Sequence, residues 1–129
     1  MDVRTATLDE LAAVLNVLDG AMLETDASSL ETKLDEGDVL VAVEPNDEAH
    51  TDRLLGALVL DQNEIVAVAV RTRRRGQGIG TALVEDAIDR RGRLVAEFDE
   101  RVRPFWESVG FAIEPVGKGE DRFLAWLEE

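Results

Sequence analysis

One short segment, Arg71–Gly80 (RTRRRGQGIG), combines four arginines with three alternating glycines. The β-branched apolar run Ile65–Val70 precedes it, and apolar residues at helical spacing follow it. A strand, a glycine loop and a helix start in this order direct free backbone N–H groups and the positive end of a helix dipole at one point. We therefore expect backbone amides here to hold a phosphorylated ligand, with arginines adding charge-assisted contacts.

The glycine spacing differs from that of two common nucleotide-binding loops. A P-loop needs Lys followed by Ser or Thr after its last glycine, whereas Gly80 is followed by Thr81 and Ala82. A dinucleotide fingerprint has its glycines at the first, third and sixth positions, whereas Gly76, Gly78 and Gly80 occupy the first, third and fifth. Neither a nucleotide triphosphatase nor a dinucleotide-binding fold is expected.

Three segments of the chain, Arg75–Gly80 (RGQGIG), Phe105–Phe111 (FWESVGF) and Val3–Glu10 (VRTATLDE), together resemble motifs of the GNAT superfamily of N-acetyltransferases. Arg75–Gly80 matches its Arg/Gln-x-x-Gly-x-Gly/Ala signature. Phe105–Phe111 (FWESVGF) is similar to the family's late motif of an aromatic pair, a polar couple, an aliphatic residue and Gly-Phe. Val3–Glu10 resembles its first strand running into its first helix. The motifs stand in the family's order over nearly the whole chain, which is identified on them as a GNAT member.

The resemblance implies that acetyl-CoA is the co-substrate, with its pyrophosphate on the glycine loop and its pantetheine arm along the preceding strand. It also implies that the strands Glu64–Val70 and Leu94–Phe98 part where the thioester lies. Glycines would be required in the loop for close backbone approach or for an unusual φ. The cofactor-binding residues implied are Val68, Ala69, Val70, Arg75, Gly76, Gln77, Gly78, Ile79, Gly80, Thr81, Asp99 and Trp106. Arg71, Arg73 and Arg74 either contact the 3′-phosphate end of CoA or pair with surface carboxylates.

Acetyl transfer to an amine requires a neutral nitrogen, so a base should accept its proton directly or through water. Glu64 is the first candidate, because some histone-acetyltransferase-type relatives carry a general-base Glu ahead of a similar Glu-Ile-Val run. Glu97 and Asp99 lie on or just after the other parting strand and are alternatives. Asp99 has a second role open to it, hydrogen bonding to the pantetheine as the family's Asn does, although a carboxylate only accepts unless protonated.

The chain departs from the family at the acid that protonates the leaving thiolate. Many members use a Tyr at the second aromatic of the late motif, but this chain has no tyrosine and carries Trp106 there. A thiol has a pKa of about 8.5, so CoA can leave as a thiolate with hydrogen-bond help or be protonated by solvent. We expect slower turnover, and a non-catalytic acyl-CoA-binding or regulatory module remains an alternative function.

Composition limits the other classes. A chain of 129 residues with 45% hydrophobic content suits a single domain over residues 1–129. Its apolar runs are of strand length and its start resembles no signal peptide, so we expect a cytoplasmic protein without a membrane partner. Cysteine is absent and His50 is the one histidine, so no metal site is expected.

The net charge is −14, from 28 acidic and 14 basic residues, and only two of the bases are lysines. One interpretation is attraction of a cationic amine. The other is adaptation to molar intracellular salt, as in an extreme halophile, where a Debye length of about 3 Å screens such attraction. Either way the charge repels nucleic acid, which leaves an arginine-loop nucleic-acid binder as the weakest of three hypotheses.

The elements needed to position these residues alternate along the chain. Strands are expected at Val3–Ala6, Val39–Val43, Leu54–Leu60, Glu64–Val70, Leu94–Phe98, Phe111–Val116 and Arg122–Trp126. Helices are expected over Leu8–Leu18 behind a Thr7/Glu10 capping box, from Ser28 to about Gly37, over Ile79–Arg91, and from Pro104 to about Val109. A polar connection is expected over Pro45–Asp52.

This order predicts an α/β (α+β) fold with a mixed central sheet of six to seven strands and about four flanking helices. The function that follows is acetyl transfer to a primary amine by direct attack on the thioester, consistent with the absence of a cysteine nucleophile. The acceptor, a small molecule or a peptide, and the oligomeric state both stay open; many relatives dimerise, so a homodimer is one of the states open to the chain.

Overall fold

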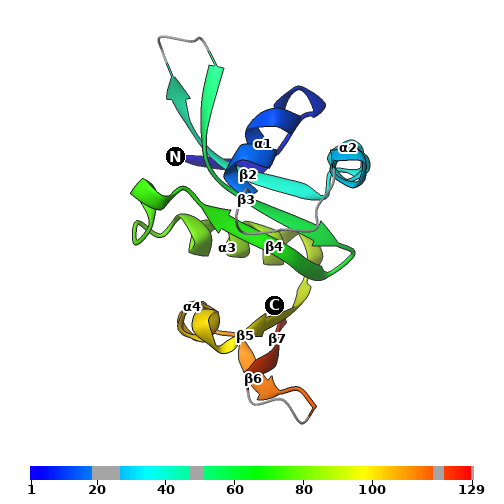
Figure 1. Cartoon of the computed structure of the whole chain (residues 1–129), viewed down its shortest axis with the longest axis vertical. Coiled ribbons are helices and arrows are strands. Elements are labelled where there is room, and N and C mark those ends of the chain that lie inside the picture. The colour runs from blue at the N-terminus through cyan, green and yellow to red at the C-terminus, as the bar shows by residue number, and fades with distance from the viewer. Residues whose placement is uncertain (19–26, 47–50, 118–120, 129) are drawn as a thin grey trace.

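The computed structural model describes residues 1–18, 27–46, 51–117 and 121–128 as one mixed sheet with helices on both faces (Figure 1). The sheet order is β1-β2-β3-β4-β5-β7-β6. The strands are β1 (Asp2–Thr5), β2 (Val39–Asn46), β3 (Thr51–Asp61), β4 (Glu64–Val70), β5 (Arg93–Asp99), β6 (Ala112–Pro115) and β7 (Arg122–Glu128). The helices are α1 (Leu11–Leu18), α2 (Ala27–Glu36), α3 (Ile79–Arg91) and α4 (Arg103–Ser108). The expected mixed α/β fold is confirmed.

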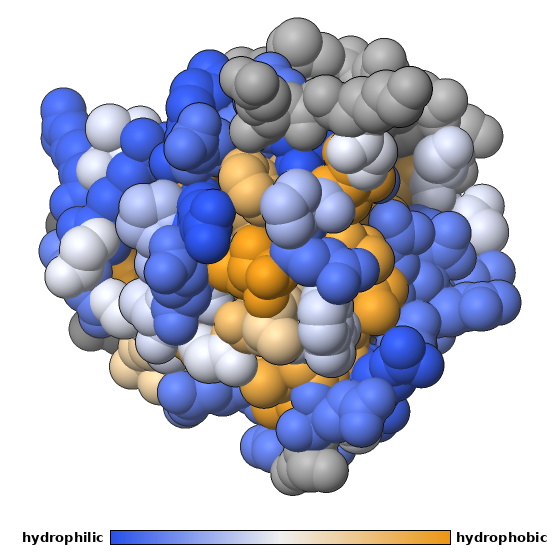
Figure 2. Space-filling model, turned by 90° about the horizontal axis from the view of Figure 1, so that it is seen from below, coloured by the Kyte–Doolittle hydropathy of each residue, from blue (hydrophilic) through white to orange (hydrophobic). Residues whose placement is uncertain are grey.

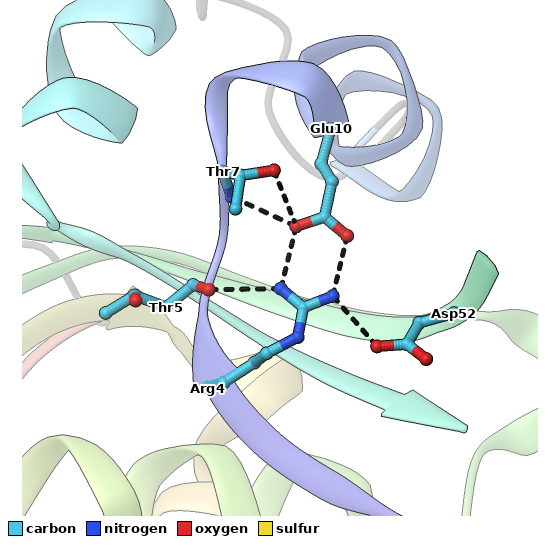
Figure 3. A network of polar contacts seen from close by, with 5 residues as sticks. All are labelled: Arg4, Thr5, Thr7, Glu10 and Asp52. Carbon is cyan, nitrogen blue, oxygen red and sulfur yellow. Dashed lines mark hydrogen bonds and ion pairs between the residues drawn. The ribbon is translucent and has the colours of Figure 1, made fainter. Parts of the chain in front are cut away.

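Single 3₁₀ turns, η1 (Leu8–Glu10), η2 (Thr72–Arg74) and η3 (Glu100–Val102), precede three of the helical segments. The predicted Thr7/Glu10 capping box is present at the first of them, where the Thr7 N–H donates to the Glu10 carboxylate at 3.0 Å. Arg4 on β1 holds the same carboxylate through two hydrogen bonds of 2.8 Å and reaches Asp52 on β3 at 3.1 Å (Figure 3). This network fixes the start of the helical layer to two strands.

Alternating side chains divide the interior into two cores, one on each face of the sheet. Leu40 and Ala42 of β2 join the core beneath α3 and α4, whereas Val39, Val41 and Val43 join the core beneath α1 and α2. Period-two alternation in a strand sends neighbouring residues to opposite faces. In the described residues, the α1/α2 core takes strand side chains from β2, β3 and β4 and none from β5, β6 or β7.

The α3 helix packs closely on the sheet because β3 has a glycine beneath it. A Cβ on Gly56 would lie 2.9 Å from the Ala69 carbonyl oxygen and 3.1 Å from a methyl of Ile79. At the other end of α3, Arg91 donates to the buried Asp38 carboxylate at 2.8 Å. Both ends of the helix that follows the glycine loop are thereby fixed against the sheet.

Two predicted boundaries are wrong. The β2–β3 hairpin continues into the expected polar connection, with Pro45 paired to Asp52. A cross-strand ion pair between Glu44 and Arg53, at 3.5 Å, supports this extension, and residues 47–50 lie outside the described residues. The second helix begins at Ala27, so Ser28 lies inside it and is not its N-cap.

Candidate active site

The parallel strands β4 and β5 pair only at their N-terminal ends. Glu64 pairs with Val95 and Ile65 with Ala96, and no later residue of either seven-residue strand pairs with the other. On its other side, β4 has a bulge where it pairs with β3. Ala67 pairs with Val59 and Ile65 pairs with Leu60. Val66 is therefore the extra residue of the bulge. The expected parting of these two strands is confirmed, and the gap opens toward their carboxyl ends.

The glycine loop lies where β4 leads into α3. Gly76 has a φ of 78° and Gly78 a φ of 80°, a left-handed region that other residues rarely adopt, so the predicted need for glycine is confirmed at both. Gly78 is the N-cap of α3, and no side chain of the described residues caps the helix there. Within the described residues, the first backbone bond of this helix runs from the Ala82 N–H to the Gly78 oxygen at 3.0 Å. The amides of Ile79, Gly80 and Thr81 are therefore free to bind an anion.

Gly80 is required for a different reason from the other two. It lies inside α3 without a positive φ, and a Cβ there would meet the Phe105 ring at 3.0 Å. Its small size lets the first turn of α3 contact α4. The sequence predicts glycine at position 80 for close ligand approach or an unusual φ. The structure gives another reason, because a side chain at this position would clash with the Phe105 ring.

The arginines divide into two groups. Arg71 donates from Nε to the Leu54 carbonyl oxygen at 2.6 Å and from Nη1 to the Asn16 side-chain oxygen on α1 at 2.9 Å. Arg74 holds Glu44 through two hydrogen bonds of 2.8 and 3.1 Å and so keeps the pKa of that carboxyl below its usual range. Both of these arginines support the loop from neighbouring elements, which agrees with the carboxylate-pairing interpretation for Arg74.

Two arginines of the segment keep their charge available. Within the described part of the chain, Arg75 makes only a long side-chain contact of 3.5 Å to the Val70 carbonyl oxygen, and Arg73 has no ion pair. Arg73 also lines a pocket of about 340 Å³ whose walls include Arg53, Arg71 and Arg74. The loop therefore carries unpaired positive charge within a few residues of the free amides of α3.

Glu64 lies at the closed end of the gap, with its side chain exposed. Its neighbour Ile65 joins the α3/α4 core, so the Glu64 side chain faces the opposite side of the sheet, the side of α1 and α2. The carboxylate has no hydrogen bond or ion pair to another described residue. At about 3.3 Å per residue, Glu64 is roughly 20 Å along β4 from Val70 and the glycine loop.

The sequence family agrees with this geometry. The acetyltransferase (GNAT) domain matches residues 35–113, which are 79 of the 129 residues and include β4, the glycine loop and α3. The chain belongs to the GNAT acetyltransferase family. No curated protein matches it in sequence.

Solved structures share the GNAT fold over almost the whole chain. Rv2747 from Mycobacterium tuberculosis, in complex with CoA and NLQ, is 19% identical with a TM-score of 0.75, covering 98% of this chain and 99% of that one. The NatC complex bound to Gag peptide and CoA gives 19% identity, a TM-score of 0.77 and coverages of 99% and 98%. The ribosomal-protein-S18-alanine N-acetyltransferase from Escherichia coli is 17% identical with a TM-score of 0.73, covering 98% of this chain and 92% of that one.

The two other carboxylates of this GNAT domain that the sequence offers as bases have partners. Asp99 accepts the Arg101 N–H at 2.9 Å as the N-cap of η3 and also binds the Arg101 guanidinium, which lowers the pKa of Asp99. Glu97 lies 3.4 Å from Arg122. Glu64 therefore differs from both in having an unpaired carboxylate among the described residues.

Trp106 lies in the aromatic core of α4 and is 4% exposed. Its ring stacks on Phe98 at 5.5 Å and meets Phe105 and Phe111 edge-on, each at 5.0 Å between centroids. This packing fixes α4 beside β5, and the cofactor-binding role of Trp106 stays a prediction.

Sequence reasoning missed the bulge at Val66 and the partners of Arg71. Val66 is 38% exposed because it is the bulged residue where β5 departs, and a bulge leaves no mark in an apolar run. Arg71 has a supporting role that depends on Leu54 and Asn16, both distant in sequence.

No helix in the described residues is long and apolar enough to cross a membrane. Nor do these residues hold a metal-binding group of three or more His, Cys, Asp or Glu.

Proposed function

We propose that this GNAT domain is an acetyl-CoA-dependent N-acetyltransferase that acts by direct transfer. The observation that carries the proposal is the combination of free amides at the start of α3 with the gap between β4 and β5. The anion site lies at the open end of the gap and the unpaired Glu64 carboxylate lies at its closed end. CoA in two of the structural relatives supports the choice of ligand.

The chain's own groups suit the parts of acetyl-CoA in turn. The amides of Ile79, Gly80 and Thr81, with Arg75, would hold the pyrophosphate. The edge of β4 from Val68 to Val70, which β5 leaves unpaired, would bond the pantetheine amides in the manner of an added strand. Asp99, at the carboxyl end of β5, lies across the gap from them.

The reaction forms a bond between the acceptor nitrogen and the acetyl carbon and breaks the bond from that carbon to sulfur. Glu64, directly or through water, would accept the proton that the amine gives up. CoA leaves as a thiolate, which water or the indole N–H of Trp106 would stabilise, since no tyrosine is present. This balance needs no cysteine and no metal.

The acceptor is a primary amine on a small molecule or a peptide. Structural relatives support both classes, because one is bound to Gag peptide and another is named agmatine N-acetyltransferase. We also propose a single domain over residues 1–129 that works in the cytoplasm at high salt, supported by the acidic, lysine-poor composition.

A non-catalytic acyl-CoA-binding module is the second candidate, favoured by the absence of tyrosine. A thiol reagent separates the two, since the cysteine-free chain contributes no thiol background. An N-acetyltransferase releases free CoA from acetyl-CoA only when an accepted amine is added, with one acetyl amide formed per thiol. Tight acetyl-CoA binding without amine-dependent release, across small amines and peptide N-termini, would establish the binding module.

A further inference from the structure

On one half of the sheet, no described helix covers the face that points away from α3 and α4. The side of β5, β7 and β6 that faces away from α3 and α4 contributes nothing to the α1/α2 core in the described residues. Leu94, Ala96 and Phe98 of β5 are buried beneath α3 and α4, so the alternate residues of β5 belong to the opposite face. Seen from below, the molecule shows apolar residues at the surface in the middle of the view, with hydrophilic ones around them (Figure 2).

Strand register gives the composition of this face, which we call the β5–β7–β6 platform. Its central row runs Glu64, Val95, Trp126 and Ala112, across β4, β5, β7 and β6. The next row is Glu97, Leu124 and Glu114, followed by Asp99 and Arg122. Val95, Leu124 and Trp126 are each only partly exposed. The platform thus has an apolar, tryptophan-bearing centre.

Acidic side chains border that centre. Arg122 pairs with Glu97 at 3.4 Å, and at the far end of the same strands Arg93 pairs with Glu128 at 3.5 Å. Glu64 and Glu114, on either side of Trp126, have no ion pair with any described residue. The unbalanced charge on the platform is therefore negative, which favours a cation.

We propose that the platform is the acceptor site and that the acceptor is a protonated amine carrying an apolar or aromatic body. This inference rests on the proposed function and names the substrate class of the same site. The ammonium would be drawn to Glu64 and the body would lie on Trp126 and Leu124, where a cation or ring gains from the indole face. The Glu64 carboxylate would then take one proton to give the neutral amine that attacks, and the second proton would pass to the leaving thiolate or to water as the amide forms.

The spacing suits a ligand of this kind. Neighbouring strands are about 4.8 Å apart, so Trp126 lies roughly 10 Å from Glu64, two strands away in the same row. An amine separated from an aromatic ring by a short alkyl chain spans much of that distance. The platform is also continuous with the gap. Glu64 and Val95 form a strand pair, and only one further pair, Ile65 with Ala96, follows before β4 and β5 separate.

Calorimetry with CoA-saturated protein tests the inference, with 2-phenylethylamine and ethylamine as probes. The wild type should bind 2-phenylethylamine more tightly, and Trp126→Ala should weaken that probe about tenfold without changing ethylamine. Trp126→Phe keeps an aromatic face and should retain most of the affinity. Val102→Ala, which removes an exposed apolar side chain outside the platform, is the matched control and should have no effect.

The charge requirement has its own variants. Glu114→Lys should weaken 2-phenylethylamine several-fold, while Glu85→Lys, the same change on the exposed side of α3, should not. Circular dichroism confirms that each variant is folded. Equal binding of both probes, or no effect of Trp126→Ala in a folded protein, overturns the inference.

Failure of this inference is separable from failure of the proposed function. If an amine triggers CoA release equally well in wild type and Trp126→Ala, the N-acetyltransferase proposal stands and the assignment of the platform as acceptor site fails. If amine binding depends on Trp126 but no CoA is released, the platform stands as an amine-binding site and the proposed catalysis fails. If sedimentation instead shows a dimer that Trp126→Arg dissociates, the platform is an interface between two copies and the acceptor assignment is overturned.

Discussion

Glu64 combines three properties that make it the first candidate for the general base. Its side chain faces the side of the sheet away from α3, it precedes the separation of β4 and β5 by one residue, and it has no partner among the described residues. Asp99 is a weaker candidate, because its hydrogen bonds to Arg101 lower its pKa. A carboxylate that is already stabilised in its charged form accepts a proton less readily.

Glu64→Gln should lower kcat about 10² to 10⁴-fold, the usual contribution of a positioned base. Acetyl-CoA affinity should be unchanged, since the glycine loop lies at the other end of β4. CoA release under amine saturation measures the effect, with Glu85→Gln on α3 as the control. An unchanged kcat in Glu64→Gln would show that Glu64 is not the general base, and Glu97 would become the next candidate to test.

Gly80 tests the contact between α3 and α4. Gly80→Ala places a Cβ 3.0 Å from the Phe105 ring and should cost about 1–3 kcal/mol of unfolding free energy, as overpacking does. Urea unfolding measures the loss. Phe105→Leu in the Gly80→Ala background should recover part of it, whereas strictly additive losses in the double variant would mean that the two residues do not interact.

The elements are held in position by contacts that join distant parts of the chain. Arg4, Glu10 and Asp52 connect β1, η1 and β3 (Figure 3). The hydrogen bonds from Arg4 are the main reason why the pKa of Glu10 lies below its ordinary value, and Glu10 in turn raises the pKa of Arg4. The ionised form of Glu10 therefore stabilises the folded state.

This linkage predicts an acid-dependent loss of stability. Because the folded pKa of Glu10 is depressed, its contribution is fully present above its unfolded pKa of about 4.3 and is lost as pH falls through the folded value. Urea unfolding from pH 7 to pH 3 should show Glu10→Gln less stable than wild type at pH 7, with the difference shrinking at the acid end. A difference that is independent of pH would contradict the ionic origin of the contact.

Local sequence signals were sufficient for most elements and insufficient for their contacts. The bounds of α3 follow from its apolar spacing and from Gly78 and Gly92 at its ends, and the structure has the helix at Ile79–Arg91 as predicted. Leu54 and Asn16, which bind Arg71, and Glu44, which binds Arg74, lie 17 to 55 residues away, so no local pattern reveals these contacts. The need for Gly80 depends on Phe105 in another helix.

At the scale of the whole molecule, net charge opposes compaction. With a charge of −14, like-charge repulsion should destabilise the folded chain at low ionic strength. Raising KCl from 0.05 to about 1 M shortens the Debye length to about 3 Å and should raise the urea midpoint. A midpoint that falls or stays constant over that range would contradict both the repulsion and the proposed high-salt setting.

The central claim is that the loop before α3 binds the pyrophosphate of acetyl-CoA. Gly78→Glu places a carboxylate at that point, and Gly92→Glu is its matched control at the opposite end of α3. Both glycines have a positive φ, of 80° and 77°, and neither would bring a Cβ within 4 Å of another atom. The backbone strain of the two substitutions should therefore be similar.

Thermal unfolding with and without acetyl-CoA at a hundred times its Kd is the most direct test. The wild type and Gly92→Glu should each gain about 2.7 kcal/mol, a shift of several degrees. Gly78→Glu should gain nothing. An unshifted wild type, or an equal shift in Gly78→Glu, would show that the glycine loop does not hold the cofactor.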